Sequence, residues 1–448
     1  MYIDFLYNRF EDKKEKTAII FDGRKYSYAD IISKIKALKK VLFESQITEG
    51  SVVSIESDNP FYSIAFLLTM IEMNYISLPL TIDSIQKFEE YFEIAQINYS
   101  ISCKDDSINI ASTGRKGTNN VYQKLRTENH PGLILFSSGT SGKSKAAVHD
   151  LTKLLKKYRI IRKDYITLAF MLFDHIGGVD TILYSLSNTS TIVFPKDRMP
   201  DTICKNIEDH RIEVLPATPT FLNLLLLSET NKKYDLSSLK YITYGTEPMP
   251  KHTLDKLFDV FPNVQLLQKY GTTEVGTLRS KSESKNSDWV KIGGEGYSTR
   301  IVDGILQIKA ESAMLGYLNA PSPFTDDGWF ITGDEVLVNG DYYRILGRRS
   351  EIINVGGEKV YPAEVENVIQ QLDFVEDVIV SGEENLIMGN IVIAKIKVIN
   401  KPSGRNKLKK IIKDHCKNNL QEYKVPLKIT FIDDQLHSMR FKKIRNFE

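Results

Sequence analysis

The residues best suited to chemistry lie in one loop, where Ser-Ser-Gly-Thr-Ser-Gly-Lys-Ser-Lys occupies positions 137–145 after the apolar run 133–136. Glycines let a backbone fold closely around an anion, while hydroxyls and lysines add donors and positive charge. Such a loop suits a triphosphate or pyrophosphate, although a plain surface loop has the same composition. A Walker loop would need glycine at position 137, where this chain has serine, so the pattern argues against a P-loop NTPase.

Six further segments contain residue types that are common in enzyme sites. They are Phe-Asp-His-Ile-Gly-Gly (173–178), Tyr-Gly-Thr-Glu-Pro (244–248), Tyr-Gly-Thr-Thr-Glu (270–274), Gly-Trp-Phe-Ile-Thr-Gly-Asp (328–334), the run 343–366 and the basic run 439–445. Taken singly, most have an ordinary structural interpretation, such as a turn after a strand, a capped helix or a basic tail.

Together, and in this order, these segments resemble the motifs of the adenylate-forming superfamily, which includes acyl-CoA synthetases, peptide-synthetase adenylation domains and luciferases. The resemblance runs from about residue 15 to the end of the chain. Three positions depart from the superfamily pattern: Ser144 replaces the usual proline, Ala146 the usual glycine, and Ser350 the Asp or Lys of a hinge. The glycine that usually precedes the C-terminal lysine is also absent.

The resemblance implies a role in nucleotide binding for a large set of residues. Thr273 would lie near the α-phosphate, and Glu274 would hold Mg²⁺, which agrees with the preference of a hard cation for oxygen ligands. Asp334 would accept hydrogen bonds from the ribose hydroxyls, and Arg348 would contact ribose or phosphate. The full set implied for ATP or AMP is Ser137, Ser138, Gly139, Thr140, Ser141, Gly142, Lys145, Gly245, Thr246, Glu247, Tyr270, Gly271, Thr272, Thr273, Asp334 and Arg348.

The remaining motifs imply the acyl chemistry. A C-terminal lysine would bridge the attacking carboxylate and the α-phosphate, where one ammonium can stabilise the transition state. Alignment on Lys-Ile selects Lys443, which we prefer, and alignment on Lys-x-x-Arg selects Lys442. His175 would lie beside the acyl carboxylate. Gly356 and Gly357 would let a thiol-bearing arm pass close to the backbone, and Ser350 would be the hinge.

The elements that position these residues are predicted to form an α/β fold. Strand-like runs alternate with helical ones from residue 165 onward, as in 191–194, 202–209, 213–216 and 219–227. This alternation predicts βαβ units and a largely parallel sheet, with a ligand crevice at one edge. We expect a large N-terminal domain of βαβ-type sheets with a small β-subdomain (1–346), a hinge (347–350) and a small, mobile α+β C-terminal domain (351–448).

Composition and charge exclude several other functions. Fifty-nine Lys and Arg against 57 Asp and Glu give a net charge of +2, which offers no reason to expect nucleic acid as a partner. The apolar run 61–80 is interrupted by Glu72 and Asn74, so it predicts a buried helix and strand rather than a membrane span. Three dispersed cysteines and a charged N-terminal segment predict reduced thiols, no signal peptide and a cytoplasmic location.

The resemblance therefore implies a ligase of the acyl-CoA synthetase type, which uses ATP and Mg²⁺ to convert a small carboxylic acid to acyl-AMP and then passes the acyl group to a thiol, such as that of coenzyme A. Two alternatives stay open. The acceptor could be phosphopantetheine on an acyl carrier protein, with an acyl or amino acid as substrate, because Asp174 matches the residue that grips an ammonium in peptide synthetases. The chain could also be a catalytically degenerate nucleotide-binding protein.

Overall fold

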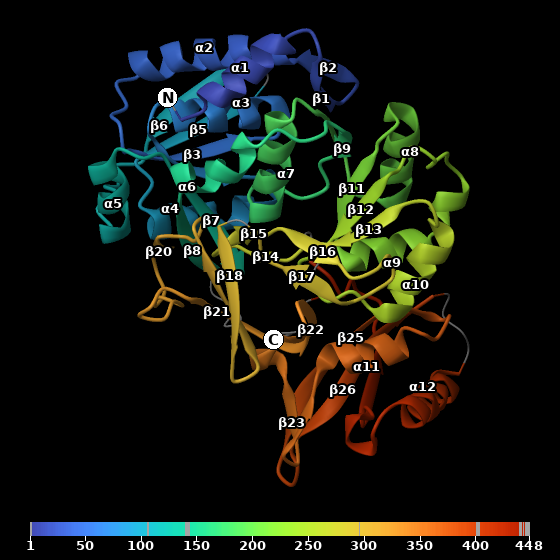
Figure 1. The fold of residues 1–448 in the computed structure, drawn as a ribbon. Coiled ribbons are helices and arrows are strands. Elements are labelled where there is room, and N and C mark those ends of the chain that lie inside the picture. The colour runs from blue at the N-terminus through green and yellow to red at the C-terminus, as the bar shows by residue number, and fades with distance from the viewer. Residues whose placement is uncertain are drawn as a thin grey trace.

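The computed structural model describes residues 2–104, 107–138, 144–294, 296–399, 404–438, 441 and 443 (Figure 1). Two seven-stranded sheets and their helices form a large body, a six-stranded sheet lies beside it, and a five-stranded sheet with helices α11 (Pro362–Ile369) and α12 (Arg405–Asn419) forms a C-terminal unit. This is the predicted α/β class. Within the described ranges, no helix is long and apolar enough to cross a membrane.

The first sheet has the strand order β13-β12-β11-β9-β10-β1-β2. Every neighbouring pair is parallel except β1 and β2, which form a hairpin through the positive-φ residues Asp22 and Gly23. The predicted βαβ alternation is thus confirmed. The strands are β1 (Thr17–Phe21), β2 (Arg24–Ser27), β9 (Ile166–Leu168), β10 (Thr191–Phe194), β11 (Val214–Ala217), β12 (Tyr241–Tyr244) and β13 (Gln265–Gln268), and the helices between them are α7 (Ile176–Ser187), α8 (Pro200–His210), α9 (Pro219–Leu227) and α10 (Lys251–Val260).

The second sheet has the order β20-β8-β7-β4-β3-β5-β6. Its strands are β3 (Val52–Ser57), β4 (Ile76–Leu80), β5 (Tyr99–Lys104), β6 (Ser107–Ser112), β7 (Gly132–Ser138), β8 (Ser144–Asp150) and β20 (Gly316–Tyr317). The associated helices are α1 (Asp4–Asp12), α2 (Tyr28–Glu44), α3 (Pro60–Glu72), α4 (Phe88–Ala95), α5 (Asn120–Glu128) and the short α6 (Leu151–Leu154). Strands β7 and β8 form the hairpin whose turn is the predicted phosphate loop.

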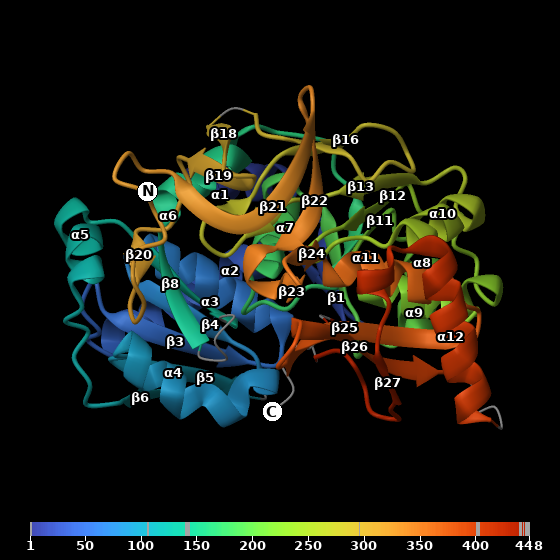
Figure 2. The ribbon, with the colours of Figure 1, turned by 90° about the horizontal axis from the view of Figure 1, so that it is seen from below.

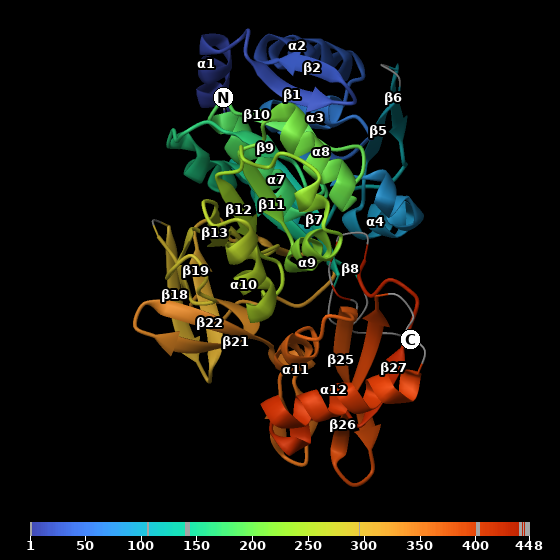
Figure 3. The same cartoon turned by 90° about the vertical axis from the view of Figure 1, so that its right-hand side faces the viewer.

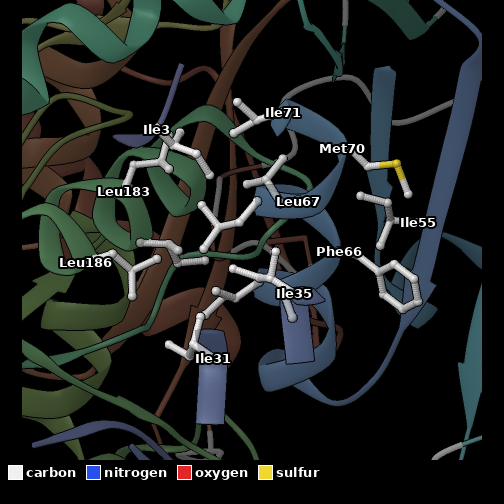
Figure 4. Close-up of a cluster of buried hydrophobic side chains, with 14 of the residues drawn as sticks. Ile3, Ile31, Ile35, Ile55, Phe66, Leu67, Met70, Ile71, Leu183 and Leu186 are labelled. Atoms are coloured by element: carbon white, nitrogen blue, oxygen red, sulfur yellow. The ribbon is translucent and has the colours of Figure 1, made fainter. Parts of the chain in front are cut away.

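The main core of the body packs helices between the two sheets. Side chains from α2, α3 and α7 meet there, with the apolar residues of α2 recurring at helical spacing (Figure 4). Helix α3 is buried along its length from Phe61 to Ile71. It begins at Pro60, because the Asn59 side chain accepts a hydrogen bond from the Phe61 N–H at 3.0 Å and Pro60 occupies the first turn.

The six-stranded sheet has the order β16-β17-β22-β21-β19-β18 and is entirely antiparallel. Its strands are β16 (Ser280–Ser282), β17 (Val290–Ile292), β18 (Tyr297–Val302), β19 (Ile305–Ala310), β21 (Phe330–Asn339) and β22 (Tyr342–Arg348). A small ladder, β14 (Gly271–Thr272) with β15 (Gly276–Thr277), precedes it. The β-subdomain that the sequence predicts is therefore present.

The C-terminal unit contains β23 (Ile353–Val355), β24 (Glu358–Val360), α11 (Pro362–Ile369), β25 (Val375–Asn385), β26 (Gly389–Val398), α12 (Arg405–Asn419) and β27 (Lys428–Phe431). Among the described residues, its buried core draws only on those between Ile353 and Phe431. Figure 3 shows the unit below the body, with α11 on the side that faces α10. A short 3₁₀ turn, Arg349–Glu351, connects it to β22 at the predicted hinge, whose boundaries stay a prediction.

Candidate active site

A cavity of about 510 Å³ opens at the carboxyl ends of β11, β12 and β13. Its walls include Gly245 and Thr246 after β12, Tyr270 and Gly271 after β13, and His175 before α7. The crevice beyond the carboxyl ends of parallel strands is the usual ligand site of open α/β sheets. The topology thus brings together five residues that the sequence assigned to the site.

The turn after β12 is shaped for close approach. A Cβ on Gly245 would lie 2.4 Å from the carbonyl oxygen of Lys269, so only glycine fits here, and Thr246 has a φ of +74°. Within the described part of the chain, the buried Tyr244 hydroxyl and the Thr272 Oγ1 have no hydrogen-bond partner. The Tyr244 side chain packs with Phe221 and Leu254 in the core on the other face of the sheet, so its hydroxyl does not face this cavity.

The Glu247 side chain points toward helix α9 rather than into this cavity. Its Oε1 accepts hydrogen bonds from the Thr220 N–H at 3.0 Å and from the Thr220 hydroxyl, which ties it to the first turn of α9. A carboxylate at the positive end of a helix is stabilised there by the unpaired N–H groups. Its predicted contact with the nucleotide stays a prediction.

Three predicted residues meet at one edge of this site. Asp334 of β21 is 8% exposed, it accepts a hydrogen bond from the Tyr270 hydroxyl, and its Oδ1 lies 3.6 Å from Nε of Arg348, its cross-strand partner on β22. Burial raises the pKa of Asp334, and the positive charge of Arg348 opposes that shift. The arrangement offers a carboxylate and a guanidinium to one ligand.

Glu274 lies at the end of the phosphate-loop hairpin. It accepts a hydrogen bond from the hydroxyl of Tyr317, and the Lys145 ammonium lies 5.6 Å from the centre of the Tyr317 ring. Strand β20 brings Tyr317 here by pairing with β8. Asn319 fixes the end of the same hairpin, because its side chain bonds the Ser144 carbonyl at 2.8 Å and the Ala146 N–H at 3.0 Å.

The middle of the phosphate loop lies outside the described residues. This applies to Gly139, Thr140, Ser141 and Gly142, and to the side chain of Ser138. Ser137 pairs with Lys145 across the hairpin. The loop's predicted role with phosphates therefore stays a prediction.

A histidine that the sequence did not single out lies beneath Thr273. His149 of β8 is fully buried, and burial lowers the pKa of its imidazole to about 4, while the nearby Thr273 and Ser312 backbones and the charge of Glu274 favour protonation. Thr273 is itself 8% exposed. His149 is therefore a neutral packing group behind the Tyr270–Glu274 segment at physiological pH.

His175 caps α7 while it lines the cavity. Its Nδ1 accepts a hydrogen bond from the Gly177 N–H at 3.1 Å. Asp174 turns the other way, and its Oδ2 accepts hydrogen bonds from Ser84 at 2.9 Å and Thr81 at 3.2 Å. Asp174 is not among the residues that line the cavity, so its position does not favour a grip on a substrate ammonium.

Lys443 lies in the C-terminal unit, and Lys442 lies outside the described residues. The Lys443 ammonium donates to Glu366 at 3.0 Å and to the Val378 carbonyl at 2.9 Å, with Asp377 at 3.7 Å. It lines a second cavity of about 400 Å³ between α9, α11 and β25. Two residues before it, Phe441 packs against Phe170 and Phe221 of the body, with ring centres 5.6 Å apart in each pair.

Gly356 and Gly357 form the exposed turn between β23 and β24, both with positive φ. They line neither cavity. Figure 2 shows the C-terminal unit from below, with β25 and β26 running beside the body. Here the unit presents Phe441, rather than its Gly-Gly turn, to the body.

Fold and site together define a nucleotide-binding protein of the adenylate-forming type. The chain belongs to the AMP-binding enzyme family, whose sequence model matches residues 6–304, and the model of the AMP-binding enzyme C-terminal domain matches residues 364–443.

Several known proteins are similar to this chain along most of its length. A 2-succinylbenzoate–CoA ligase from Listeria innocua serovar 6a is 24% identical, over 96% of this chain and 95% of that protein. Acyl-CoA synthetase 7 from Caenorhabditis elegans is 30% identical over 70% of this chain and 64% of that protein. The crystal structure of ATP-bound MatB from Rhodopseudomonas palustris superposes with a TM-score of 0.80, at 22% identity, over 97% of this chain and 95% of that one.

Proposed function

We propose that this protein is an acid–thiol ligase that converts a small carboxylic acid to acyl-AMP with ATP and transfers the acyl group to coenzyme A. The observation that carries the proposal is the meeting of Tyr270, Asp334 and Arg348 beside a cavity at the strand ends. Membership of the AMP-binding enzyme family supports the adenylate chemistry. The names of relatives such as the 2-succinylbenzoate–CoA ligase support coenzyme A as the acceptor.

The residues present fit ATP and its metal. The close backbone approach at Gly245 suits a flat base, and Asp334 suits a vicinal diol. Glu274, beside Lys145 and Tyr317, is the residue that would hold Mg²⁺. Bound there, the ion would neutralise charge on the departing pyrophosphate.

In the first half-reaction, the acid's carboxylate attacks the α-phosphorus and pyrophosphate leaves. The chain contributes position and electrostatic stabilisation: Thr273 near the α-phosphate, His175 beside the carboxylate, and the loop 137–145 around the leaving group. In the second, the thiol attacks the acyl carbon and AMP leaves. Because acyl-AMP hydrolyses readily, the site must exclude water between these steps.

We propose that the C-terminal unit turns about residues 347–350 between the two steps. Support comes from its separate core, from the exposed Ser350 and from the contrast between Lys443 near the body and the Gly-Gly turn far from both cavities. Lys443 is the lysine that we assign to the first half-reaction. It would have to exchange Glu366 and Asp377 for the substrate carboxylate and phosphate.

Carboxylate-dependent ATP–pyrophosphate exchange tests the function. The wild type should exchange label between pyrophosphate and ATP in the presence of at least one acid from a panel of aliphatic, aryl and amino acids. The exchange rate of Lys443→Ala should be lower by about a hundredfold or more. The same variant should keep most of its ability to form thioester from supplied acyl-AMP. Lys428→Ala, which removes an exposed lysine paired with Glu383, is the matched control.

The assay also separates the alternatives. If the protein binds nucleotide but catalyses exchange with none of the acids, it is a degenerate nucleotide-binding protein instead. Coenzyme A and a phosphopantetheine carrier protein, offered in parallel after acid and ATP, would show which acceptor is used. The three cysteines are free and buried, which supports the cytoplasm as the proposed compartment.

A further inference from the structure

The strand-end cavity carries more positive charge than negative charge. Among the described residues, four cationic side chains line it, Lys157, Arg162, Lys269 and Arg279, against a single carboxylate, Asp180. A cavity for a plain aliphatic or aryl acid would need positive charge only where the reacting carboxylate meets the nucleotide.

One of the four cations is already neutralised. Lys157 pairs with Asp180, which also accepts a hydrogen bond from the Tyr158 hydroxyl at 2.6 Å, and the Lys157 ammonium donates to the Thr277 carbonyl at 3.0 Å. Within the described ranges, the side chains of Arg162, Lys269 and Arg279 form no hydrogen bond or ion pair. Three positive charges therefore face one cavity without an ion-pair partner among the described residues.

Lys269 is the innermost of these three. It lies between β13 and Tyr270, with its backbone N–H donating to the Tyr244 carbonyl at 2.7 Å and its Cβ near Gly245, whereas Arg162 and Arg279 lie at exposed positions. Burial lowers the pKa of Lys269, Asp180 raises it, and Lys157 and Arg162 lower it further. An ammonium that has lost water and gained no partner would be stabilised by an anion brought in by a ligand.

This surplus charge does not belong to the nucleotide phosphates. The predicted phosphate contacts are the loop hairpin with Lys145, and Glu274, and none of their described residues lines this cavity. The walls around the three cations are instead aromatic and apolar, with Tyr165, Tyr184, Tyr241 and Met171. Such walls suit a carbon skeleton that carries a second charge.

We propose that the acid which this enzyme activates is a dianion, whose second carboxylate is held by Lys269 with Arg162 and Arg279 near the mouth of the cavity. This inference rests on the proposed function, because it names the substrate class of the same site. The reacting carboxylate lies toward His175 and the nucleotide, and the second one contacts Lys269. The cations thus select against monocarboxylic acids of the same size.

Matched pairs of acids test this inference. Succinate, glutarate and terephthalate are each compared with the corresponding half-amide in the pyrophosphate-exchange assay, because a carboxamide has the shape of a carboxylate without its charge. For at least one pair, we expect the diacid to have a kcat/KM about tenfold to a hundredfold higher than the half-amide, the size of one charge-assisted contact. Lys269→Met should remove most of that preference and leave the KM for ATP unchanged.

Two further variants complete the experiment. Lys269→Gln repeats the test with a polar side chain. Lys281→Met removes an exposed lysine of β16 that does not line the cavity, and it should leave the preference for diacids unchanged. Equal use of diacids and half-amides by the wild type, or an unchanged preference in both Lys269 variants, would overturn the inference while the exchange itself still supported the ligase. Exchange with none of these compounds and no other acid would contradict the ligase as well.

Discussion

Asp334 is the single residue on which nucleotide binding is expected to depend most. It combines burial, the Tyr270 hydroxyl and a nearby guanidinium, so it is held in one position before any ligand arrives. Asp334→Asn keeps the shape but removes the charge that would accept two ribose hydroxyls. We expect the KM for ATP to rise about tenfold to a hundredfold, as for the loss of a hydrogen bond to a charged group.

Steady-state exchange kinetics at varied ATP concentration measure this effect. The control is Asp341→Asn, an exposed acid in the turn between β21 and β22 that pairs with Lys291. A variant at position 334 with the KM of the wild type would show that the carboxylate does not touch the nucleotide.

His149 gives a second expectation at this scale, because it is the residue whose protonation the fold opposes most clearly. Its pKa is lowered to about 4 in the folded protein, against about 6.5 in an unfolded chain. A lowered histidine pKa stabilises the fold fully above pH 6.5, and this contribution is lost as pH falls from 6.5 to 4. The total is about 3 kcal/mol.

Urea unfolding at pH 7 and at pH 5 measures this loss. A His149→Gln variant should have a lower free energy of unfolding at pH 7 and a weaker dependence on pH over this range. His415→Gln on α12 is the control. If His149→Gln kept the full pH dependence of the wild type, another group would have to carry it.

At the scale of elements, the close contact between the turn after β12 and the end of β13 sets the shape of the site. Gly245→Ala would place a Cβ against the Lys269 carbonyl, and forcing the two strands' ends apart costs about 1–3 kcal/mol. We expect the Gly245→Ala variant to have a lower melting temperature and to bind ATP much more weakly than the wild type. Calorimetric titration with ATP, alongside thermal unfolding, checks both, and ATP binding as tight as that of the wild type would argue against a nucleotide at this turn.

The elements were also the part of the molecule that the sequence predicted best. Strand β10 and helix α9 have the predicted bounds, because their apolar runs are bounded by local turn and capping residues. The contacts of Tyr317 with Glu274 and of Asn319 with the β7–β8 hairpin could not be predicted, since they depend on β20 pairing with β8, which lies about 170 residues earlier in the chain. Lys269 was missed for a similar reason: only the folded sheet shows that it faces the same cavity as Arg162.

At the scale of the whole molecule, Glu335 holds the C-terminal unit in the orientation seen here. This residue of β21 accepts hydrogen bonds from Lys359 and Tyr361 at 3.0 Å and lies 3.3 Å from Arg349 in the hinge. Glu335→Gln removes the charge that holds all three. The unit should then leave this orientation about five- to thirtyfold more often, for a loss of ~1–2 kcal/mol at a partly exposed cluster.

Limited trypsin digestion at Arg348 and Arg349 reports on that opening, because a hinge must open before a protease can bind it. We expect faster cleavage in the Glu335→Gln variant. Glu383→Gln breaks a pair with Lys428 inside the C-terminal unit and should leave the rate unchanged. Equal rates for wild type and the Glu335 variant would mean that other contacts dominate the docking.

The packing of Phe441 against Phe170 and Phe221 has a consequence for turnover. If the C-terminal unit swings as proposed, each catalytic cycle must withdraw this ring into water, which opposes the motion by up to about 1.5–3 kcal/mol. The contact of Phe441 with the body would then have to break before the acyl acceptor reacts. A Phe441→Ala variant should speed the rotation of the C-terminal unit and slow the first half-reaction.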